Sequence, residues 1–312
     1  MDKFLTAHLD RFSRTRFQKL IKDGAIKING AVVEKPGFKL KAGDKITIED
    51  SEFLLPDKEF VVEPDPNIPL DIVYEDKDIV VINKQAGLVV HPTPRQHRHT
   101  LANALVAKYP NIAHVGENTL RPGIVHRLDK DTSGLMAIAK NQEAFTFLKN
   151  QFLAHEVVKV YLALVEGVPA EKKGVITFQI RPSALNRLKK VAVRHLDTSG
   201  RKSIRSAETH YKVKNKIGAN FALLEVTPKT GRTHQIRVHL TAIGHAILGD
   251  TMYHAKNPKD YGDLKELMKR QMLHAYKLKF IAPSGKKLDL ESPMPPDMAV
   301  LVKALKKIKT TE

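Results

Sequence analysis

The stretch RPGIVHRLDKDTSGLMAIAK, residues 121–140, joins a candidate catalytic acid to the beginning of a buried strand. Residues 132–134, Thr-Ser-Gly, are typical of a polar turn, and the apolar run after them predicts the strand. Asp129 lies just before that turn, between two basic residues. Reactive side chains usually lie on loops held by a rigid scaffold, so Asp129 is a candidate catalytic carboxylate. A solvated surface turn is the alternative, because turns rich in Asp, Ser and Gly are common.

Other kinds of site would use some of the same residue types. A calcium-binding loop that began at Asp129 would need a bidentate Glu at its twelfth position, but Lys140 lies there and would repel the ion. Asp129 and Asp131 could form the acid–base pair of a glycosidase, but a spacing of two within a turn does not fix their geometry. We keep Asp129 alone as the reactive residue. His234 and His239 lack the neighbouring Glu of a zinc motif, so we predict no metal site.

The composition of the chain is that of a globular protein. With 312 residues, 42% of them hydrophobic, it is long enough for one large core and a small additional domain. It contains no cysteine, which excludes disulfides and thiolate metal sites and fits a reducing compartment. No apolar run approaches membrane-spanning length, and the first eight residues hold no apolar signal core. We expect a cytoplasmic protein that does not bind membranes.

The charge of the chain predicts a polyanionic partner. Lys and Arg number 52 against 34 Asp and Glu, which gives a formal net charge of +18. Basic residues gather between residues 181 and 205, where Asp197 is the only acid. This basic strip is expected to follow RNA phosphates, although a basic loop with no ligand is the alternative. Its predicted RNA-binding residues are Arg187, Lys189, Lys190 and Arg194.

Residues 1–50 are expected to form a small, self-contained α/β domain. A helix is predicted over residues 14–23, and short strands over 25–28, 31–34 and 45–49. Asn29-Gly30, between the first two strands, is a strong hairpin signal. The helix carries four basic residues that favour a surface facing RNA, although an ordinary amphipathic helix explains them as well. They are Arg14, Arg16, Lys19 and Lys22.

A proline-rich linker and a larger domain follow. Residues 51–69 contain four prolines and many charges, which predicts an extended linker. Because strands outnumber helices in residues 70–312 and do not alternate with them, we expect an α+β fold there. Its mixed, mostly antiparallel sheet would be flanked by helices and would carry a central cleft. The predicted strands are 72–75, 79–83, 157–165, 175–180 and 221–227, and the predicted helices are 100–109 and 142–152.

Residues 230–240, TGRTHQIRVHL, are a second candidate part of the site. Thr233 is a suitable N-cap for a helix over the residues that follow it. Arg237 lies beside the apolar face of that helix, where its guanidinium could reach a partly buried carboxylate such as Asp129. A surface salt bridge is the alternative for Arg237.

Several short blocks of the sequence resemble a known family. In order and spacing they are similar to the RluA/RluD family of RNA pseudouridine synthases, and residues 1–50 resemble the small RNA-binding domain, named after a small-subunit ribosomal protein, that often precedes such enzymes. The resemblance covers nearly the whole chain, and Gln85, where the family usually has Pro, is a departure near the cleft. The blocks are 73–76 (VYED), 83–87 (NKQAG), 91–92 (HP), 126–129 (HRLD), 132–134 (TSG), 159–161 (KVY) and 231–237 (GRTHQIR).

The resemblance implies an enzyme that converts specific uridines to pseudouridine, with large-subunit (23S-type) ribosomal RNA as the expected substrate and residues 70–312 as the catalytic domain. Moving the ribose from nitrogen-1 to carbon-5 of uracil involves no redox change, so no cofactor is expected. Asp129 can act as a nucleophile or as a base that removes a ribose proton, and both routes stay open. Base flipping, at a cost of roughly a few kcal/mol, would expose the uridine.

The resemblance also implies roles for single residues. Tyr161 would stack on the flipped uracil and help to remove the carbon-5 proton, although a Tyr in a strand is more often part of a core. Arg237 would pair with Asp129, and Arg127 would fill the space that the base leaves. A non-catalytic RNA-binding or ribosome-assembly factor is the alternative function, and we expect a monomer. Further expected substrate contacts are His126, Thr132, Arg232 and His234.

Overall fold

The computed structural model divides the chain into two compact units, Met1–Val61 and Val62–Glu312. It describes residues 1–9, 14–49, 61–93, 96–186, 188–193, 203–254 and 262–307, without the side chains of residues 15 and 16. Residues 51–60 of the predicted linker lie outside these ranges, and the domain boundaries at 50 and 69 stay a prediction. No helix within the described ranges is both long and apolar enough to cross a membrane.

The first unit packs two helices against a small sheet. Its core includes Phe17 of α2 and Ile26 of β1, and Leu5 of α1 adds to it. Asp2 of α1 joins the two helices, because its carboxylate accepts hydrogen bonds from Gln18 (2.6 Å) and Arg14 (2.7 Å) of α2. These hydrogen bonds lower the pKa of Asp2 to about 2. The β1–β2 pairing confirms the predicted hairpin. The elements are α1 (Asp2–His8), α2 (Arg14–Lys22), β1 (Ile26–Ile28), β2 (Ala31–Val32) and β3 (Ile46–Ile48).

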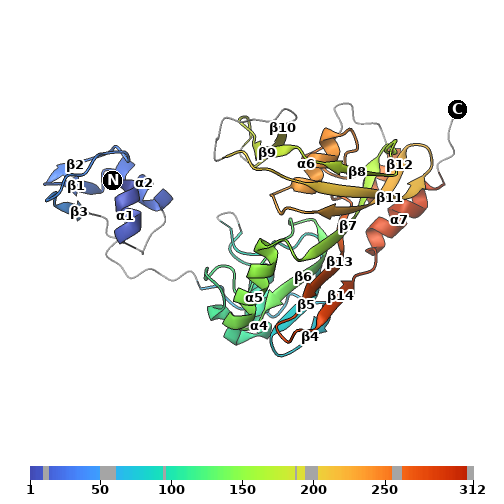
Figure 1. The fold of residues 1–312 in the computed structure, drawn as a ribbon, viewed down its shortest axis with the longest axis horizontal. Helices are drawn as coiled ribbons and strands as arrows, with labels where there is room; N and C mark the ends of the chain where they lie inside the picture. Colours follow the sequence, from blue (N-terminus) through green and yellow to red (C-terminus); the bar gives the residue numbers. More distant parts are fainter. Residues whose placement is uncertain are drawn as a thin grey trace. The chain divides into compact units, whose positions relative to one another are not determined.

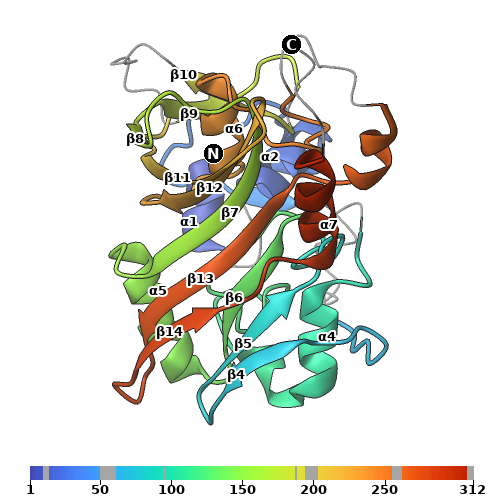
Figure 2. The same cartoon turned by 90° about the vertical axis from the view of Figure 1, so that its right-hand side faces the viewer.

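The second unit is built on a nine-stranded sheet. The strand order is β4-β5-β6-β13-β7-β12-β11-β8, and β14 pairs with β13 (Figure 2). Every pairing is antiparallel except that of β6 with β13, which confirms the expected mixed, mostly antiparallel sheet. The strands are β4 (Ile72–Glu75), β5 (Ile79–Lys84), β6 (Ser133–Ala139), β7 (Val158–Glu166), β8 (Lys173–Ile176), β11 (Thr209–Ile217), β12 (Phe221–Pro228), β13 (Leu273–Ile281) and β14 (Lys287–Glu291).

The parallel pairing of β6 with β13 explains why Ser133 and Gly134 occur at the beginning of β6. Gly134 lies opposite Ala275 and has a φ of +116°, and a Cβ at Gly134 would lie 2.3 Å from the carbonyl oxygen of Ala275. Only glycine fits such a close approach of two backbones. Beside it, the Ser133 hydroxyl and His274 Nδ1 are 3.0 Å apart and hydrogen-bonded. The turn that follows Asp129 is therefore attached directly to the middle of the sheet.

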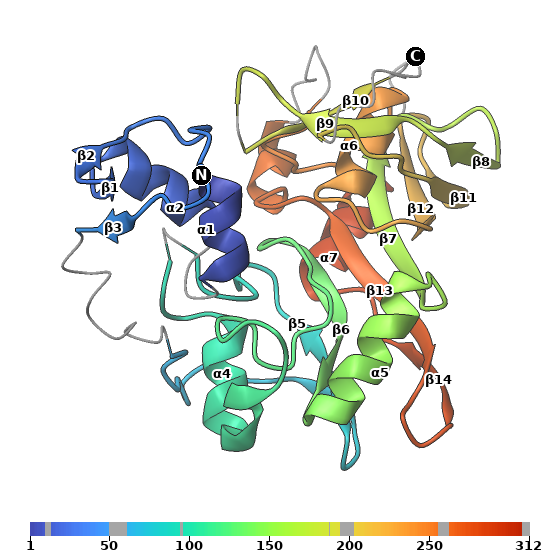
Figure 3. The same cartoon turned by 60° about the vertical axis from the view of Figure 1, so that its left-hand side comes forward.

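Two hydrophobic cores share this sheet. One joins β5 and β6 to α4 and α5, which Figure 3 shows in front of these strands. The other joins β7 and β12 to α6 and α7. Tyr161 of β7 packs against both cores, so it marks the boundary between the two halves of the unit. The helices are α4 (Leu101–Lys108), α5 (Gln142–Leu153), α6 (Gln235–Ala242) and α7 (Pro296–Leu305), with short 3-10 helices at Pro110–His114 and Gly262–Leu267.

A separate hairpin, β9 (Gln179–Pro182) and β10 (Lys190–Val193), lies beside α6 (Figure 1). The single strand predicted over 175–180 is therefore wrong, because β8 ends at Ile176 and pairs with β11, whereas β9 pairs with β10. The chain leaves the large sheet after Ile176, and the carbonyl oxygen of Phe178 accepts a hydrogen bond from the buried His239 of α6 (2.9 Å).

Candidate active site

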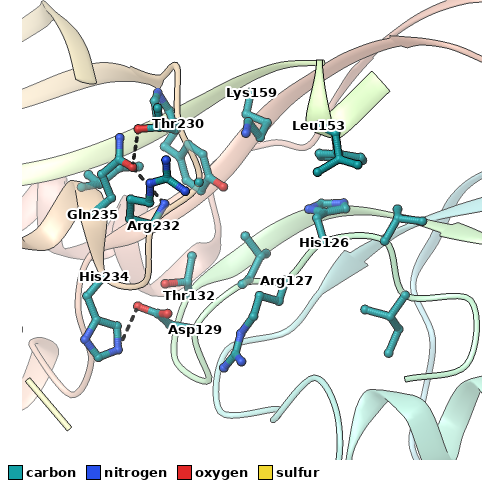
Figure 4. Close-up of a pocket in the computed structure, with 18 of the residues that line it drawn as sticks. His126, Arg127, Asp129, Thr132, Leu153, Lys159, Thr230, Arg232, His234 and Gln235 are labelled. Carbon is teal, nitrogen blue, oxygen red and sulfur yellow. Dashed lines mark hydrogen bonds and ion pairs between the residues drawn. The ribbon is translucent and has the colours of Figure 1, made fainter. Parts of the chain in front are cut away.

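A cavity of about 600 Å³ opens where the loop before β6, strand β7, helix α5 and the beginning of α6 meet. It lies between the two halves of the second unit, and all of the residues predicted as catalytic or substrate-binding line it. Figure 4 shows the Asp129 carboxylate directed towards His234, with Arg127 on its other side. The predicted residues in the lining are His126, Arg127, Asp129, Thr132, Tyr161, Arg232, His234 and Arg237.

Among the described residues of the second unit, the predicted RNA-binding residues Lys189 and Lys190 do not line this cavity. Arg14, Lys19 and Lys22 are exposed on α2, where Arg14 pairs with Asp2. Lys189 and Lys190 are half-buried at the beginning of β10. The side chain of Arg16, and Arg187 and Arg194 as a whole, lie outside the described part of the chain.

The backbone that carries Asp129 is held from behind by a buried lysine. Lys84 is 1% exposed, and its Nζ donates to the carbonyl oxygens of Lys130 (2.9 Å), Gln85 (2.8 Å) and Leu88 (3.0 Å). Burial lowers the pKa of Lys84 to about 7. The amide of Thr132 donates to the Asp129 carbonyl at 3.1 Å and closes the turn. This support leaves the Asp129 side chain, 21% exposed, free to face the cavity.

Arg237 bridges Asp129 and a second carboxylate. Its Nη1 donates to Asp129 (2.8 Å), while Nε and Nη2 donate to the two oxygens of Asp250 (2.7 and 2.8 Å). The Asp250 side chain is completely buried and also accepts the amides of Met252 (3.0 Å) and Tyr253 (2.9 Å). Burial lowers the pKa of Arg237, but the two carboxylates outweigh this effect and raise it above its ordinary value. The arginine therefore stays charged and orients Asp129 rigidly.

Tyr253 contacts both His234 and Arg237. The Tyr253 hydroxyl lies 2.9 Å from His234 Nδ1, and its ring lies 5.0 Å from the Arg237 guanidinium carbon. Burial lowers the pKa of His234 against the pull of the Asp129 charge, so the ring is neutral near pH 7. When the hydroxyl donates to Nδ1, the proton of His234 lies on Nε2, which is 3.8 Å from the Asp129 carboxylate. In that tautomer, His234 turns a polar N–H towards the acid.

The beginning of α6 differs from the sequence prediction. The residue at the N-cap is His234, with a φ of 58°, so the expected Thr233 cap is wrong. The Gln235 side chain stabilises the preceding loop instead, because its Oε1 accepts from the Arg232 amide (3.0 Å) and the Thr230 hydroxyl (2.7 Å) (Figure 4). This arrangement turns the His234 ring into the cavity.

The remaining predicted residues form the walls of the cavity. Burial and the Asp129 charge raise the pKa of Tyr161 above its ordinary value, so its phenol keeps its proton. Thr132 is buried and accepts a hydrogen bond from Gln271 (3.3 Å). Arg127 and Arg232 are exposed, and Arg232 donates to the Ser206 carbonyl (3.0 Å).

His126 supports one wall through its own neighbours. Its Nε2 accepts the Ala137 amide (2.9 Å), and its ring stacks on Phe152 at 4.4 Å between centroids. Burial, and then the charge of Lys159, lower the pKa of His126 to about 3. A backbone amide can only donate, so Nε2 is unprotonated and the ring proton is on Nδ1.

This lowered pKa predicts a pH dependence of stability. The ordinary pKa of His126 is 6.5, so as the pH falls from 6.5 towards 3 the unfolded chain binds the proton before the folded one. The contribution of His126 to the free energy of unfolding is therefore complete above pH 6.5 and is lost progressively below it. His126→Gln keeps an acceptor for the Ala137 amide but does not titrate. Urea denaturation between pH 7 and 4 should give a flatter profile for His126→Gln than for the wild type, and parallel profiles would contradict the assignment.

Three site residues were not predictable as such from their sequence context. Lys84 lies within a block of the family resemblance, but its role depends on carbonyl groups that only the fold brings together. Asp250 follows an apolar run and a glycine, which is a weak sign of a buried acid. Tyr253 has no sequence signal for its place beside Arg237.

The chain is similar in sequence to a known family of proteins. The sequence profile of the family described as RNA pseudouridylate synthase matches residues 78–242, and that of the S4 domain matches residues 2–46. The chain is 39% identical to the ribosomal large subunit pseudouridine synthase D of Zymomonas mobilis, across 98% of this chain and 93% of the relative. It is 37% identical to an uncharacterized RNA pseudouridine synthase, YlyB, of Bacillus subtilis, across 98% and 94%.

A solved structure supports the same conclusion. The structure titled human RNA pseudouridylate synthase domain containing 4 superposes with a TM-score of 0.58 at 28% identity, and the match covers 78% of this chain and 95% of the human one. The profile match covers most of the residues that line the cavity. The chain therefore belongs to the RNA pseudouridylate synthase family, and it is an RNA pseudouridine synthase, an isomerase, with an S4 domain at its N-terminus.

Proposed function

We propose that this enzyme converts specific uridines of large-subunit ribosomal RNA to pseudouridine, with Asp129 as the catalytic carboxylate. The assignment of Asp129 rests chiefly on one observation, its ion pair with Arg237 in the lining of the cavity. Two related proteins, one from Zymomonas mobilis (39% identical) and one from Vibrio parahaemolyticus (36% identical), are named ribosomal large subunit pseudouridine synthase D. These names support the ribosomal target.

In the proposed reaction, every bond and proton that is lost is matched by one that is gained within the same uridine. The bond from ribose C1′ to uracil N1 breaks, a bond from C1′ to C5 forms, the C5 proton leaves and N1 gains a proton. Asp129 begins the reaction either as a nucleophile or as a base that removes a ribose proton, and its fixed position beside Arg237 serves both routes. No oxidant, reductant or net water is consumed, so the proposal includes no cofactor. We place the enzyme in the cytoplasm, where it would act on its RNA as a monomer.

The target base would enter the cavity by flipping out of the RNA. Arg127, exposed at the cavity, would occupy the space that the base leaves, and His126, Thr132, Arg232 and His234 would surround the flipped nucleotide. Tyr161 would stack on the uracil. Because its raised pKa keeps the phenol protonated, Tyr161 could accept the C5 proton only while passing its own proton on.

The hydroxyl of Tyr161 can be tested apart from its ring. Tyr161→Phe should lower the single-turnover rate by about 100-fold, because the ring still stacks but cannot relay a proton. Tyr161→Ala should in addition weaken RNA binding, because stacking is lost. Tyr276→Phe is the matched control, since the Tyr276 hydroxyl bonds the exposed Glu291 on another part of the sheet. A wild-type rate for Tyr161→Phe would remove the hydroxyl from the mechanism.

The target itself requires a cellular experiment. Pseudouridines should be mapped across total RNA with the gene present, deleted, and restored as wild type or as Asp129→Asn. We expect specific sites in large-subunit ribosomal RNA to disappear on deletion and to return only with the wild type. Losses confined to transfer RNA or messenger RNA would overturn the ribosomal assignment, and restoration by Asp129→Asn would overturn the catalytic one.

A further inference from the structure

The tip of the β9–β10 hairpin exposes two leucines beside basic residues. Leu185 is 99% exposed and Leu188 is 55% exposed, so the pair presents apolar surface that no described part of the chain covers. Arg181 and Lys189 lie on either side of this tip along the hairpin. Single exposed apolar side chains are common, but two large ones on one short loop indicate a surface that meets a partner.

The tip is shaped before any partner arrives. The Ser183 amide donates to the Lys189 carbonyl (3.0 Å), and the Ser183 hydroxyl accepts the amides of Leu185 and Asn186 (both 3.3 Å). The Asn186 side chain accepts the Leu188 amide (2.9 Å). These contacts restrain the backbone beside each leucine, which reduces the conformational freedom that Leu185 and Leu188 would lose on binding.

The base of the hairpin is attached to the active site. The amide of Lys190 donates to the Tyr253 hydroxyl (2.7 Å), and that hydroxyl also contacts His234. Tyr253 packs with Ile180 of β9 and Val238 of α6 in a small hydrophobic cluster. The same tyrosine therefore contacts both the base of the hairpin and Arg237, which itself binds Asp129.

We propose that Leu185 and Leu188 insert between bases of the RNA beside the target uridine, while Arg181, Lys189 and Lys190 contact the flanking phosphates. This inference rests on the proposed function. Apolar wedges that enter a base step unstack it, and unstacking next to the uridine lowers the cost of flipping it into the cavity. The neighbouring cations and the net charge of +18 favour a polyanion over a protein or a lipid surface as the partner.

Three paired substitutions separate the wedge from its charges. Leu185→Ser with Leu188→Ser removes the apolar surface, Leu185→Met with Leu188→Met keeps it, and Lys189→Ala with Lys190→Ala removes charge. Val300→Ser is the matched control, because Val300 is 51% exposed on α7. The probe is an unmodified transcript of large-subunit ribosomal RNA. Affinity is measured against salt concentration, and the rate of pseudouridine formation is measured in single turnovers.

We expect the serine pair to bind about tenfold more weakly and to react more slowly, with an unchanged dependence of affinity on salt. The methionine pair should recover most of the affinity and rate that the serine pair loses, and Val300→Ser should behave as the wild type. The lysine pair should instead flatten the salt dependence, by about one unit of log–log slope for each lost phosphate contact.

The failures of the two proposals look different. If the wild type modifies no uridine in the transcript, the ribosomal target fails. If the wild type is active and the serine pair binds and reacts equally well, only the wedge is overturned. A serine pair that weakens binding but flattens the salt dependence like the lysine pair would also overturn it, since the effect would then come from displaced cations.

Discussion

Asp129→Asn should abolish pseudouridine formation while the protein stays folded and binds RNA. The amide keeps the shape of the carboxylate but is neither a nucleophile nor a base, so we expect the rate to fall by about 10⁴-fold or more. The fold should tolerate the change, because Arg237 keeps both hydrogen bonds to Asp250 and the Asp129 side chain is partly exposed. The loss of unfolding free energy should be at most about 1 kcal/mol.

The measurement is pseudouridine formed in a ribosomal RNA transcript, together with RNA affinity and urea denaturation. Asp131→Asn is the matched control, since it removes the same charge from the same turn, two residues away. We expect Asp131→Asn to retain activity within a few-fold of the wild type. Appreciable product from Asp129→Asn, with a normal fold, would contradict the proposed mechanism.

Asp250→Ala should cause the largest loss of stability among substitutions near the site. It removes two hydrogen bonds and a charge from the buried Arg237 and leaves the amides of Met252 and Tyr253 without their acceptor. Breaking a buried ion pair by removing one partner costs about 3–5 kcal/mol of unfolding free energy. Activity should fall as well, because the remaining pair with Asp129 no longer has a fixed direction.

Asp297→Ala is the control for that experiment. Asp297 also accepts two hydrogen bonds from one arginine, Arg270 (2.7 and 2.9 Å), but its side chain is 46% exposed. Arg270 Nη1 also donates to backbone carbonyl oxygens, and these bonds remain when Asp297 is removed from its exposed position. Urea denaturation should show a loss of about 1 kcal/mol. If Asp250→Ala and Asp297→Ala lost equal unfolding free energy, the burial of Asp250 would add nothing to the stability that its ion pair gives.

The sequence predicts those strands whose apolar pattern is uninterrupted. The run at 79–83 predicts β5 to within one residue, because nearly every side chain of that strand is buried. It does not predict β13, where charged residues such as Lys277 and Lys279 break the run. His274 of that strand is buried only because Ser133 and the Ser292 carbonyl bind its ring. Those partners lie far away in the sequence.

The same limit applies to the site. Arg237 is predictable as a partner for Asp129, because its place beside an apolar helix face directs it inward. Asp250 is not, because a Gly-Asp pair after a helix is typical of a surface turn, and only the folded Arg237 makes its complete burial tolerable. The roles of the lining residues, and the basic strip as an RNA contact, stay predictions that the proposed experiments address.

The place of β13 in the sheet sets the order in which a growing chain can become an enzyme. β13 lies between β6 and β7, although it is made after every other strand except β14. Before Leu273 is synthesised, the strands on either side of β13 can form, but no strand lies between β6 and β7 to pair with them. The edge of β7 that pairs with β13, at Tyr161 among other residues, is then unpaired. A nascent chain therefore contains Asp129 and Arg237 before it contains the strand that joins the two halves of the sheet.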